Sequence, residues 1–546
     1  MNTYKNILKT IMIAGVSLAT FSCGSGFLDI NTDPNNAAKP VARLLLPTSQ
    51  VSLFGAVGDG QNGLGNPASV FVHQHNQRTQ NDNYAISGGQ VAVLNAWANA
   101  YTNVIESCNR IIQASEPTGN FAYVGIAKIQ KAVMFTYLVD IYGDVPFTEA
   151  NSPAKTTQPK PDKGADVYAG AIKLLDEAIA DLAKPSSAVP AGDDLIYGGD
   201  TDKWRKFAKT FKLRLYNQVR NVQDVKAAVN SLLQEGDLIN DAGTSFSLTY
   251  GSSSAPEDRH PMYIGEYNAA QRLNHISPYF YEIMADTSAV VANGLSQISN
   301  PIYRGIKDPR VPYYFYNQRR TGQATQNPFE YRLGNTVSIY FNSTGPNRDF
   351  DQSNSLTVVG LYPCGGKYDD GSAAAANLSS STGAGTQRLL PYYSVLFIRA
   401  ELAQVGVSSE NPRNLLSQGI DAAFSEVNRM AAAFSAPIIP ADRINAYRTV
   451  VLARYDAASP EGKLEHILTQ KWIANYGSSV ESYNDVRRTG FPKTFVKSMP
   501  GVPNFVLTGS GVFPFSFPYP QREINTNPNI VQKLIGTPAA KVFWQK

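Results

Sequence analysis

The residues that could carry out chemistry are few and scattered along this chain of 546 residues. Histidine occurs only at positions 73, 75, 260, 275 and 466. Neither the nucleophilic-serine pattern G-x-S-x-G nor the zinc-peptidase pattern H-E-x-x-H is present. The stretch GLYPCGGKY, residues 360–368, comes near a phosphate-binding loop, but Gly366 stands where that loop needs its lysine. The sequence therefore offers little support for catalysis.

His73 and His75 are two residues apart, a spacing that on a strand places both side chains on one face. Such a pair could bind a metal ion, but no cluster of carboxylates or cysteines accompanies it. We interpret the two imidazoles as polar groups of a loop or as hydrogen-bonding partners of a ligand. The prediction is that the protein has no metal site and needs no cofactor.

Asp140 and Asp144 are the clearest pair of carboxylates, in the stretch LVDIYGDVPF. Two carboxyl groups that converge in space can hydrolyse a glycosidic bond, one as acid and the other as base or nucleophile. Gly143 and Pro146, however, are typical of a helix end followed by a turn. We therefore predict a structural role for both aspartates.

Cys23 follows a leader that is typical of exported proteins. Two lysines precede an apolar stretch at 11–21, which is about half the roughly 20 residues that a membrane span requires. Bacterial lipoprotein signals end in such a cysteine, whose thiol receives a diacylglyceryl group. The only other cysteines, Cys108 and Cys364, are too few for a disulfide framework or a zinc site. We predict a signal peptide over 1–22 and a fatty-acyl (palmitate-type) anchor on Cys23, with an ordinary thiol as the alternative.

An alternating run of Asp and Asn at 29–35 invites comparison with a calcium loop. An EF-hand loop needs glycine at its sixth position and glutamate at its twelfth. Counted from Asp29, those positions hold Pro34 and Pro40. The run therefore predicts a turn that follows the anchor.

The composition favours a protein that handles neutral polar partners. Hydrophobic residues make up 43% of the chain, charged residues only 17%, and the net charge is +4. No run of Lys and Arg suggests binding to nucleic acid. The 29 tyrosines and 25 phenylalanines stand among many Asn, Gln, Ser and Thr. Rings stack on neutral ligands and amides bond to them, although aromatic loops can also pack on themselves.

Apolar residues recur at spacings of three and four along several segments, which is typical of amphipathic helices. Paired helices joined by short turns resemble a tetratricopeptide-like scaffold, although no clean 34-residue repeat is present. The prediction is a mainly α fold with tetratricopeptide-like helix pairs. The predicted helices cover 91–114, 122–141, a segment after Asp166 as N-cap, 202–219, 396–405, 413–434, 440–454 and 461–476.

Between about 240 and 390 the composition changes, and Gly, Ser, Asn, Pro and Tyr dominate. Two short segments, VSIYF and LTVVGLY, are possible strands. Residues 365–387 are low in complexity and predict a long exposed loop, of a kind that is often functional. We expect residues 23–546 to form one domain. In it, a helical scaffold at about 40–240 and 390–490 carries this loop-rich insert.

Six stretches, in order along the chain, resemble the SusD/RagB family, the nutrient-binding outer-membrane lipoproteins of Bacteroidetes. They are FLDINTDPN, LVDIYGDVPFTEA, TDKWRKFAKTFKLRLYNQV, KDPRVPYYF, ILTQKWIANYGSSVESYNDVRRTGFP and YPQREINTNPN. The resemblance implies a lipoprotein that is anchored in the outer membrane and displayed at the cell surface. Such a protein caps a SusC-like TonB-dependent transporter and delivers oligosaccharides, or in some members peptides, without catalysis.

The family motifs themselves are best explained as architecture. In YNDVRRTGFP, Asp485 is placed to pair with Arg488, three residues on in a helix. Gly490 suits the left-handed cap of that helix, and Pro492 prevents its continuation.

Residues that could bind a ligand lie in two other stretches. FVHQHNQRTQNDNY, residues 71–84, is so polar that we expect it to face water or a ligand rather than the core. Trp97 follows on a helix where the family often has a ring near its pocket, with core packing as the alternative. EDRHPMYIGEYN, residues 257–268, adds an arginine and two tyrosines. The predicted ligand-binding residues are His75, Arg78, Asn81, Tyr84, Trp97, Arg259, Tyr263 and Tyr267.

Two other functions are alternatives to nutrient binding. A surface glycoside hydrolase or peptidase on a helical frame predicts convergent carboxylates or a metal in a large pocket. A purely structural surface scaffold predicts that nutrient uptake survives without this protein.

Overall fold

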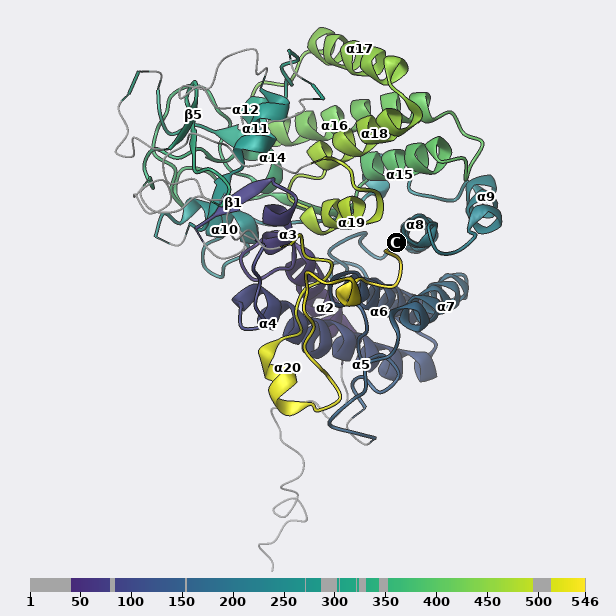
Figure 1. Ribbon diagram of the computed structural model, residues 1–546. Helices are drawn as coiled ribbons and strands as arrows, with labels where there is room; N and C mark the ends of the chain where they lie inside the picture. The colour runs from purple at the N-terminus through teal and green to yellow at the C-terminus, as the bar shows by residue number, and fades with distance from the viewer. Residues whose placement is uncertain are drawn as a thin grey trace, which may run out of the picture.

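The computed structural model describes residues 41–78, 84–152, 155–270, 272–285, 302–303, 305–320, 322–323, 330–342, 352–493 and 512–545. The leader, Cys23, the run at 29–35 and Asn81 lie outside these residues, so what the sequence predicts for them stays a prediction. Helices dominate the described part of the chain, which confirms the predicted mainly α fold (Figure 1).

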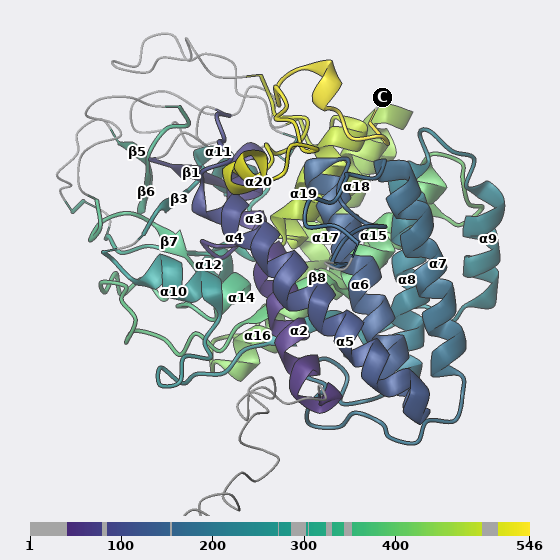
Figure 2. The ribbon, with the colours of Figure 1, turned by 90° about the horizontal axis from the view of Figure 1, so that it is seen from below.

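The first helical group is a row of neighbouring helices in which α6 contacts α5 and α7, and α7 contacts α8. Figure 2 shows α5, α6, α7 and α8 side by side, with α9 at the edge. The group comprises α2 (Ala42–Val57), α3 (Gly65–Phe71), α4 (Val91–Asn99), the π-helix η2 (Ala100–Ile105), α5 (Glu106–Ser115), η3 (Glu116–Thr118), α6 (Phe121–Tyr142), α7 (Gly164–Leu182), α8 (Thr201–Val219) and α9 (Lys226–Glu235).

The second helical group lies toward the C-terminus and joins the first through contacts between α15 and α8 and between α19 and α3. Within it, α15 contacts α16 and α18, and α17 packs on both of those helices. Its members are α15 (Tyr392–Gln404), α16 (Pro412–Ala433), α17 (Ala441–Ala457), α18 (Pro460–Ala474) and α19 (Ser479–Thr489).

Local chemistry explains where several of these helices begin and end. The side chain of Asp200 accepts hydrogen bonds from the backbone N–H groups of Asp202 and Lys203 and so caps α8. Gly490 ends α19 in the left-handed region, with φ at 79°, as predicted. The prediction that Asp166 caps α7 is wrong. The helix begins two residues earlier at Gly164, and Asp166 lies in its first turn, where a carboxylate favours the helix dipole.

The loop-rich part contains short elements between the two helical groups. Its strands form two-stranded antiparallel pairs: β1 (His75–Gln77) with β3 (Asn274–Ile276), β2 (Phe246–Thr249) with β8 (Thr386–Leu390), β4 (Phe315–Tyr316) with β7 (Val358–Val359), and β5 (Tyr331–Leu333) with β6 (Thr336–Ser338). The predicted strand LTVVGLY contains the shorter β7, whereas VSIYF, residues 337–341, overlaps β6 only at Val337 and Ser338. The short helices of this part are η4 (Ala242–Thr244), α10 (Pro261–Tyr267), α11 (Pro278–Met284), α12 (Val311–Tyr314) and α14 (Leu361–Cys364). Two more, α20 (Gln521–Thr526) and η5 (Pro538–Ala540), follow the second helical group.

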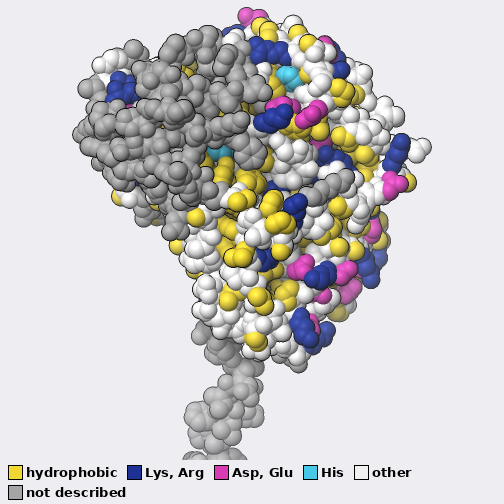
Figure 3. Space-filling view, viewed as in Figure 1, with side chains coloured by type: hydrophobic (Ala, Val, Ile, Leu, Met, Phe, Trp, Pro, Cys, Tyr) yellow, Lys and Arg dark blue, Asp and Glu magenta, His cyan; other side chains and the backbone are white. Residues whose placement is uncertain are grey.

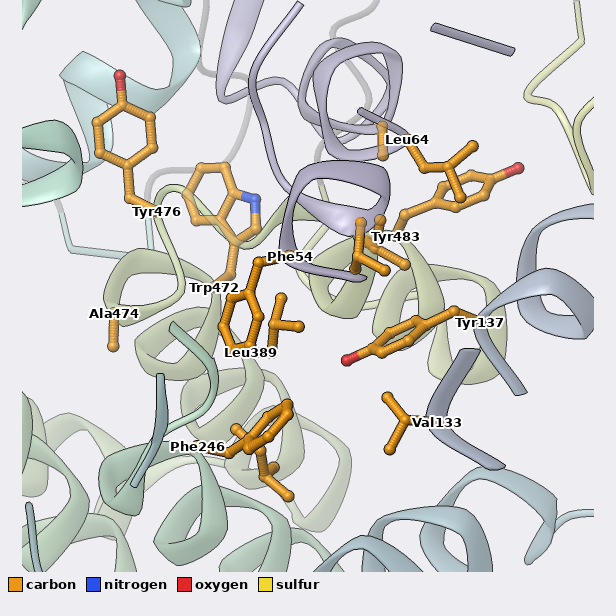
Figure 4. Close-up of a cluster of buried hydrophobic side chains, with 14 of the residues drawn as sticks. Phe54, Leu64, Val133, Tyr137, Phe246, Leu389, Trp472, Ala474, Tyr476 and Tyr483 are labelled. Carbon is orange, nitrogen blue, oxygen red and sulfur yellow. The ribbon is translucent and has the colours of Figure 1, made fainter. Parts of the chain in front are cut away.

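A continuous core ties these parts together (Figure 4). Phe246 of β2 stacks on Phe207 of α8, with ring centroids 3.8 Å apart, and meets Phe54 of α2 at 5.1 Å. In the second group, the indole Nε1 of Trp472 donates to the carbonyl of Val72 at 3.1 Å. Segments far apart in sequence are therefore fixed against each other, which gives surface sites a rigid support.

Candidate functional site

The polar stretch that begins at residue 71 is buried where it is described, up to residue 77. His75 shares hydrogen bonds with Ser69 Oγ at 3.0 Å and with Tyr476 OH at 2.8 Å. Gln74 Nε2 donates to the carbonyl of Trp472 at 2.8 Å. The expectation that this whole stretch faces water or a ligand is therefore wrong for residues 71–77, because they are buried and several of their polar groups bond to distant parts of the chain.

His73 belongs to this buried segment, and Arg78 and Tyr84 follow it in the sequence. The Tyr84 hydroxyl and His73 Nε2 are 2.7 Å apart, and both rings pack against Phe341. Arg78 is half-buried, and its charge adds to the burial that lowers the pKa of His275 to about 3. Burial alone lowers the pKa of His73 to about 3, so its imidazole is neutral at physiological pH. As ligand contacts, His75, Arg78 and Tyr84 remain predictions.

The second predicted stretch, residues 257–268, holds the segment 359–381 through hydrogen bonds. Tyr263 and Tyr267 stack with centroids 4.5 Å apart, and both side chains are fully buried. Tyr263 OH donates to the Ser381 carbonyl at 2.7 Å, and Tyr267 OH donates to the Val359 carbonyl at 2.9 Å. Arg259 pairs with Glu257 at 2.6 Å. These contacts position residues 359–381, and a role in binding stays a prediction.

An uncharged cavity of about 630 Å³ lies beside α4 and η2. Its walls come from α2 with the corner that follows it, from the outer face of α4 and η2, and from α10. Asn95 Nδ2 donates to Asn62 Oδ1 at 3.0 Å, and Asn103 Nδ2 donates to Asn99 Oδ1 at 2.6 Å. The polar side chains that line it are amides and hydroxyls: Ser52, Gln61, Asn62, Asn95, Asn99, Thr102 and Asn103.

A second cavity, of about 690 Å³, lies on the other side of α4. Its lining includes aromatic side chains and two charged residues. It is bounded by α4, η2, the segment that follows Pro146, and α20. Asn95, Ala98 and Thr102 line both cavities, so the two adjoin across α4. We call their combined lining the α4 groove. Its charged residues, Arg522 and Glu523, both belong to α20.

Of the predicted ligand residues that the structure describes, Trp97 is the one that lines this groove. It is only 4% exposed, because its ring packs against Tyr101 and Tyr142, with centroids 5.0 Å from each. Burial raises the pKa of the Glu523 carboxyl, and a hydrogen bond to Trp97 opposes this rise. Most of the indole is therefore core, as the alternative interpretation had it, while Tyr101 beside it is half-buried in the groove wall.

The backbone is irregular where the two cavities meet. The π-helix η2 interrupts the path from α4 to α5 and carries Tyr101, Thr102 and Asn103. Such π segments within helices are rare and often occur at functional sites. The predicted single helix over 91–114 is therefore divided, and the division lies in the wall of the groove.

Sequence reasoning missed the glycine-rich corner GDGQNGLG, residues 58–65, which supplies part of this wall. Residues 58–63 fit the pattern G-x-G-x-x-G, but they follow a helix rather than the strand of a dinucleotide-binding unit. A Cβ at Gly63 would lie 2.0 Å from the Gly58 carbonyl oxygen, so the corner needs glycine there. The pattern could have been found, but its context would not have indicated an amide-lined cavity.

Asp140 is a fully buried structural residue that lines neither cavity of the α4 groove. Its carboxylate accepts from Arg214 Nη2 at 2.6 Å, from Trp544 Nε1 at 3.0 Å, from Asn484 Nδ2 at 3.0 Å and from the Tyr168 hydroxyl. Asp144 instead pairs at the surface with Lys163 at 2.9 Å. The two carboxylates do not converge on one space, which supports the structural role predicted for both.

The motif YNDVRRTGFP also serves the architecture. Arg488 Nη2 contacts Asp485 at 2.6 Å, which confirms the predicted pair, and it contacts Glu401 of α15 at 2.7 Å. Lys471 of α18 joins Asp485 at 2.9 Å. Although burial would raise the pKa of Glu401, the neighbouring cations hold it well below the usual range, so this buried cluster stays charged.

The described ranges contain neither a metal-binding cluster nor a membrane-spanning helix. There, no group of three or more His, Cys, Asp or Glu side chains is arranged to hold a metal ion. No helix in those ranges has the length and apolar character needed to cross a membrane. On the face seen in Figure 3, charged side chains of both signs are interspersed among hydrophobic and uncharged polar ones.

The fold and the groove define a class: a mainly α-helical protein with tetratricopeptide-like helix pairs and a loop-rich part between them. A family described as "Starch-binding associating with outer membrane", SusD-like, matches residues 34–520. The chain therefore belongs to the SusD-like family, as its sequence motifs indicate. A search of curated proteins finds no match.

Solved structures share the fold over nearly their whole length. A SusD/RagB family protein from Bacteroides thetaiotaomicron is 20% identical and superposes with a TM-score of 0.66, over 93% of this chain and 99% of that one. A chitin-binding protein is 21% identical, with a TM-score of 0.68 over 93% and 100%. A SusD homolog from Parabacteroides distasonis is 19% identical, with a TM-score of 0.67 over 93% and 98%.

Proposed function

We propose that this protein is a non-enzymatic lipoprotein, anchored in the outer membrane through Cys23 and displayed at the cell surface. It binds a nutrient, an oligosaccharide or a peptide, and hands it to a SusC-like TonB-dependent transporter. Membership of a family described as starch-binding and associated with the outer membrane supports the binding role and the location. The anchor rests on the leader and its cysteine, and the transporter on the resemblance to SusD/RagB proteins.

The observation that carries the binding role is the lining of the α4 groove. Amides and hydroxyls both donate and accept hydrogen bonds, which is what a sugar hydroxyl or a peptide group requires. Neutral polar groups lose less on desolvation than charged ones, so such a surface suits an uncharged ligand. Tyr101 adds part of a ring face, and each ring–ligand stack contributes about 1 kcal/mol.

The first experiment identifies the ligand. A carbohydrate and peptide array is probed with the chain that begins at residue 24, and hits are measured by calorimetry. We expect selective binding of one class of neutral oligosaccharide or peptide, with no product released on long incubation. Cleavage of the bound polymer by the purified protein would refute the non-enzymatic role.

The second experiment locates the site with matched asparagines. Asn95 and Asn103 are exposed in the groove, whereas Asn414 is exposed near the start of α16, away from it. The double variant Asn95→Ala/Asn103→Ala should weaken binding about tenfold, since each lost hydrogen bond costs about 0.5–1.5 kcal/mol. Asn414→Ala should bind as the wild type does. If both proteins bind equally well, the α4 groove is not the site, and Arg78→Ala and Tyr84→Phe test the predicted region beyond β1.

The anchor is tested separately. Cys23→Ser should move the protein from the membrane fraction to the soluble fraction, and protease treatment of whole cells should digest only the wild-type protein at the surface. Retention of Cys23→Ser in the membranes would refute lipid anchoring without affecting the binding role.

A further inference from the structure

A second concave site lies on the face of the β2–β8 pair that points away from the core. In this pair Ser247 lies opposite Arg388, and Thr249 lies opposite Thr386. All four side chains line a cavity of about 490 Å³, while Phe246 and Leu248, which alternate with them, are buried. The alternation of a strand therefore presents a polar face to this space.

The opposite wall is one face of α16. Ala422, Ser425, Glu426 and Arg429 line the cavity at helical spacings of three and four. The turn at η4 and the segment at 391–393, with two tyrosines, supply the rest of the lining. We call this space the α16 pocket. It shares no lining residue with the α4 groove.

Arg388 is the group in this pocket that lacks a full set of partners. Its side chain is 5% exposed, its Nε donates to Glu426 Oε1 at 2.6 Å, and its Nη1 donates to the Thr386 carbonyl at 2.8 Å. Its Nη2 is buried and makes no hydrogen bond with any described residue. In a guanidinium, Nη2 shares an edge with Nε, so this donor lies on the edge that faces Glu426 of the pocket wall. A buried donor without a partner costs about 1–3 kcal/mol, which a bound acceptor would recover.

A second guanidinium stands beside the first. Arg429 contacts the same Glu426 carboxylate at 2.7 Å and is 48% exposed. Burial would raise the pKa of Glu426, but the charges of Arg388 and Arg429 lower it to about 2, so Glu426 is ionised. The cluster of Arg388, Arg429 and Glu426 therefore has one net positive charge, which Asp241 balances over the lining as a whole. The other carboxylate in the lining, Asp241, accepts from Thr244 N at 2.8 Å and caps η4.

We infer that the α16 pocket binds a small carboxylate ligand, with the carboxylate at Arg388 and Arg429 and a hydroxylated or amide body along the strand face. Guanidinium groups recognise carboxylates with paired, charge-assisted hydrogen bonds. A cavity of this volume fits a molecule of the size of a sugar acid or a dipeptide. In a dipeptide, the ammonium group could pair with Asp241, which a sugar acid would leave unused.

Calorimetry at pH 7 and low salt tests this site with defined probes. The probes are sodium glucuronate, the dipeptide Ala-Ala, and glucose as the uncharged counterpart of glucuronate. Arg429→Ala is compared with Arg413→Ala, because both arginines are on α16, are about equally exposed and pair with a carboxylate. We expect glucuronate, the dipeptide or both to bind, and glucose not to bind. Arg429→Ala should raise the dissociation constant at least tenfold, and Arg413→Ala should leave it unchanged.

Each outcome decides the inference. Binding of glucuronate alone assigns the pocket to acidic sugars, binding of the dipeptide alone assigns it to peptide ends, and binding of both assigns it to carboxylates in general. If neither probe binds, if glucose binds as well as glucuronate, or if both arginine variants bind alike, the inference is wrong. Asn95→Ala/Asn103→Ala should keep carboxylate binding, so failure of the α4 groove and failure of this pocket can be told apart.

Discussion

Replacing Asp140 by asparagine should destabilise the protein strongly, even though the two side chains have nearly the same size. The Asp140 carboxylate lies between α6, α8 and α19. It accepts four hydrogen bonds, from Arg214, Asn484, Trp544 and the Tyr168 hydroxyl. An asparagine side chain has one oxygen and one N–H₂ group. If the N–H₂ group replaces Oδ2, Arg214 and Asn484 both lose their acceptor. If it replaces Oδ1, Trp544 Nε1 loses its acceptor, whereas the Tyr168 hydroxyl can rotate and accept from the amide.

The magnitude follows from this geometry. Asp140 is fully buried and Arg214 is 2% exposed, so solvent does not screen their pair. Glu481 stays at 2.7 Å from Arg214 and keeps that cation partly paired. Breaking a buried pair costs about 3–5 kcal/mol when one partner is removed. We expect a loss at the lower end of this range, about 3 kcal/mol, because Glu481 remains.

Urea unfolding at pH 7, followed by tryptophan fluorescence, measures this loss. Asp144→Asn is the matched control, because Asp144 is four residues away and its ion pair with Lys163 is exposed to solvent. The control should unfold close to the wild type. If Asp140→Asn is as stable as Asp144→Asn, the buried network does not support the fold, and the structural interpretation of this motif fails.

Further predictions follow from burial and backbone conformation. Burial raises the pKa of Asp59 to about 6 from 3.8, so this group stabilises the fold at low pH and loses that effect as pH rises through 6. Asp59→Asn should remove this pH dependence, which amounts to up to about 3 kcal/mol of unfolding free energy between pH 4 and 6, as measured by urea titrations. Burial lowers the pKa of His75 to about 3, so its stabilising effect is present above pH 6.5 and lost as pH falls, and its imidazole NMR signals should not move between pH 5 and 8. Gly490→Ala should lower the unfolding free energy by about 1 kcal/mol, and Gly490→Asn by less, because φ is 79° there. Burial raises the pKa of Cys108 to about 12, so thiol reagents should label it only after denaturation.

The helices could be predicted because their signal is local. Trp204, Phe207, Phe211 and Leu215 recur at helical spacing, and all four are buried on one face of α8. Asp166 shows the limit of such a prediction. Aspartate is a good capping residue and was expected to begin the helix, but it lies two positions inside it. Helix existence depends on a long pattern, whereas a helix end depends on one or two residues.

The candidate site was less predictable because the partners of its residues are distant in sequence. His75 bonds to Tyr476, 401 residues away, and Gln74 bonds to the carbonyl of Trp472, 398 residues away. A polar stretch whose partners cannot be seen looks like an exposed surface. Asn95 and Asn103, in contrast, are ordinary polar positions of an amphipathic helix, and nothing local indicates that they line a cavity.

The distribution of charge explains why both kinds of polar residue exist in one protein. The charged residues Asp140, Arg214, Glu401 and Arg488 are inside, where they fix the helical groups to one another. None of them lines the α4 groove, whose lining is mostly neutral. A neutral ligand can exchange water for amides there at little desolvation cost, whereas a charged ligand would lose more hydration and meet charged groups only at Arg522 and Glu523 of α20. The two proposed sites therefore differ in the charge of their ligand: a neutral cargo suits the α4 groove, and a carboxylate suits the α16 pocket, where Nη2 of Arg388 lacks a hydrogen-bond partner among the described residues.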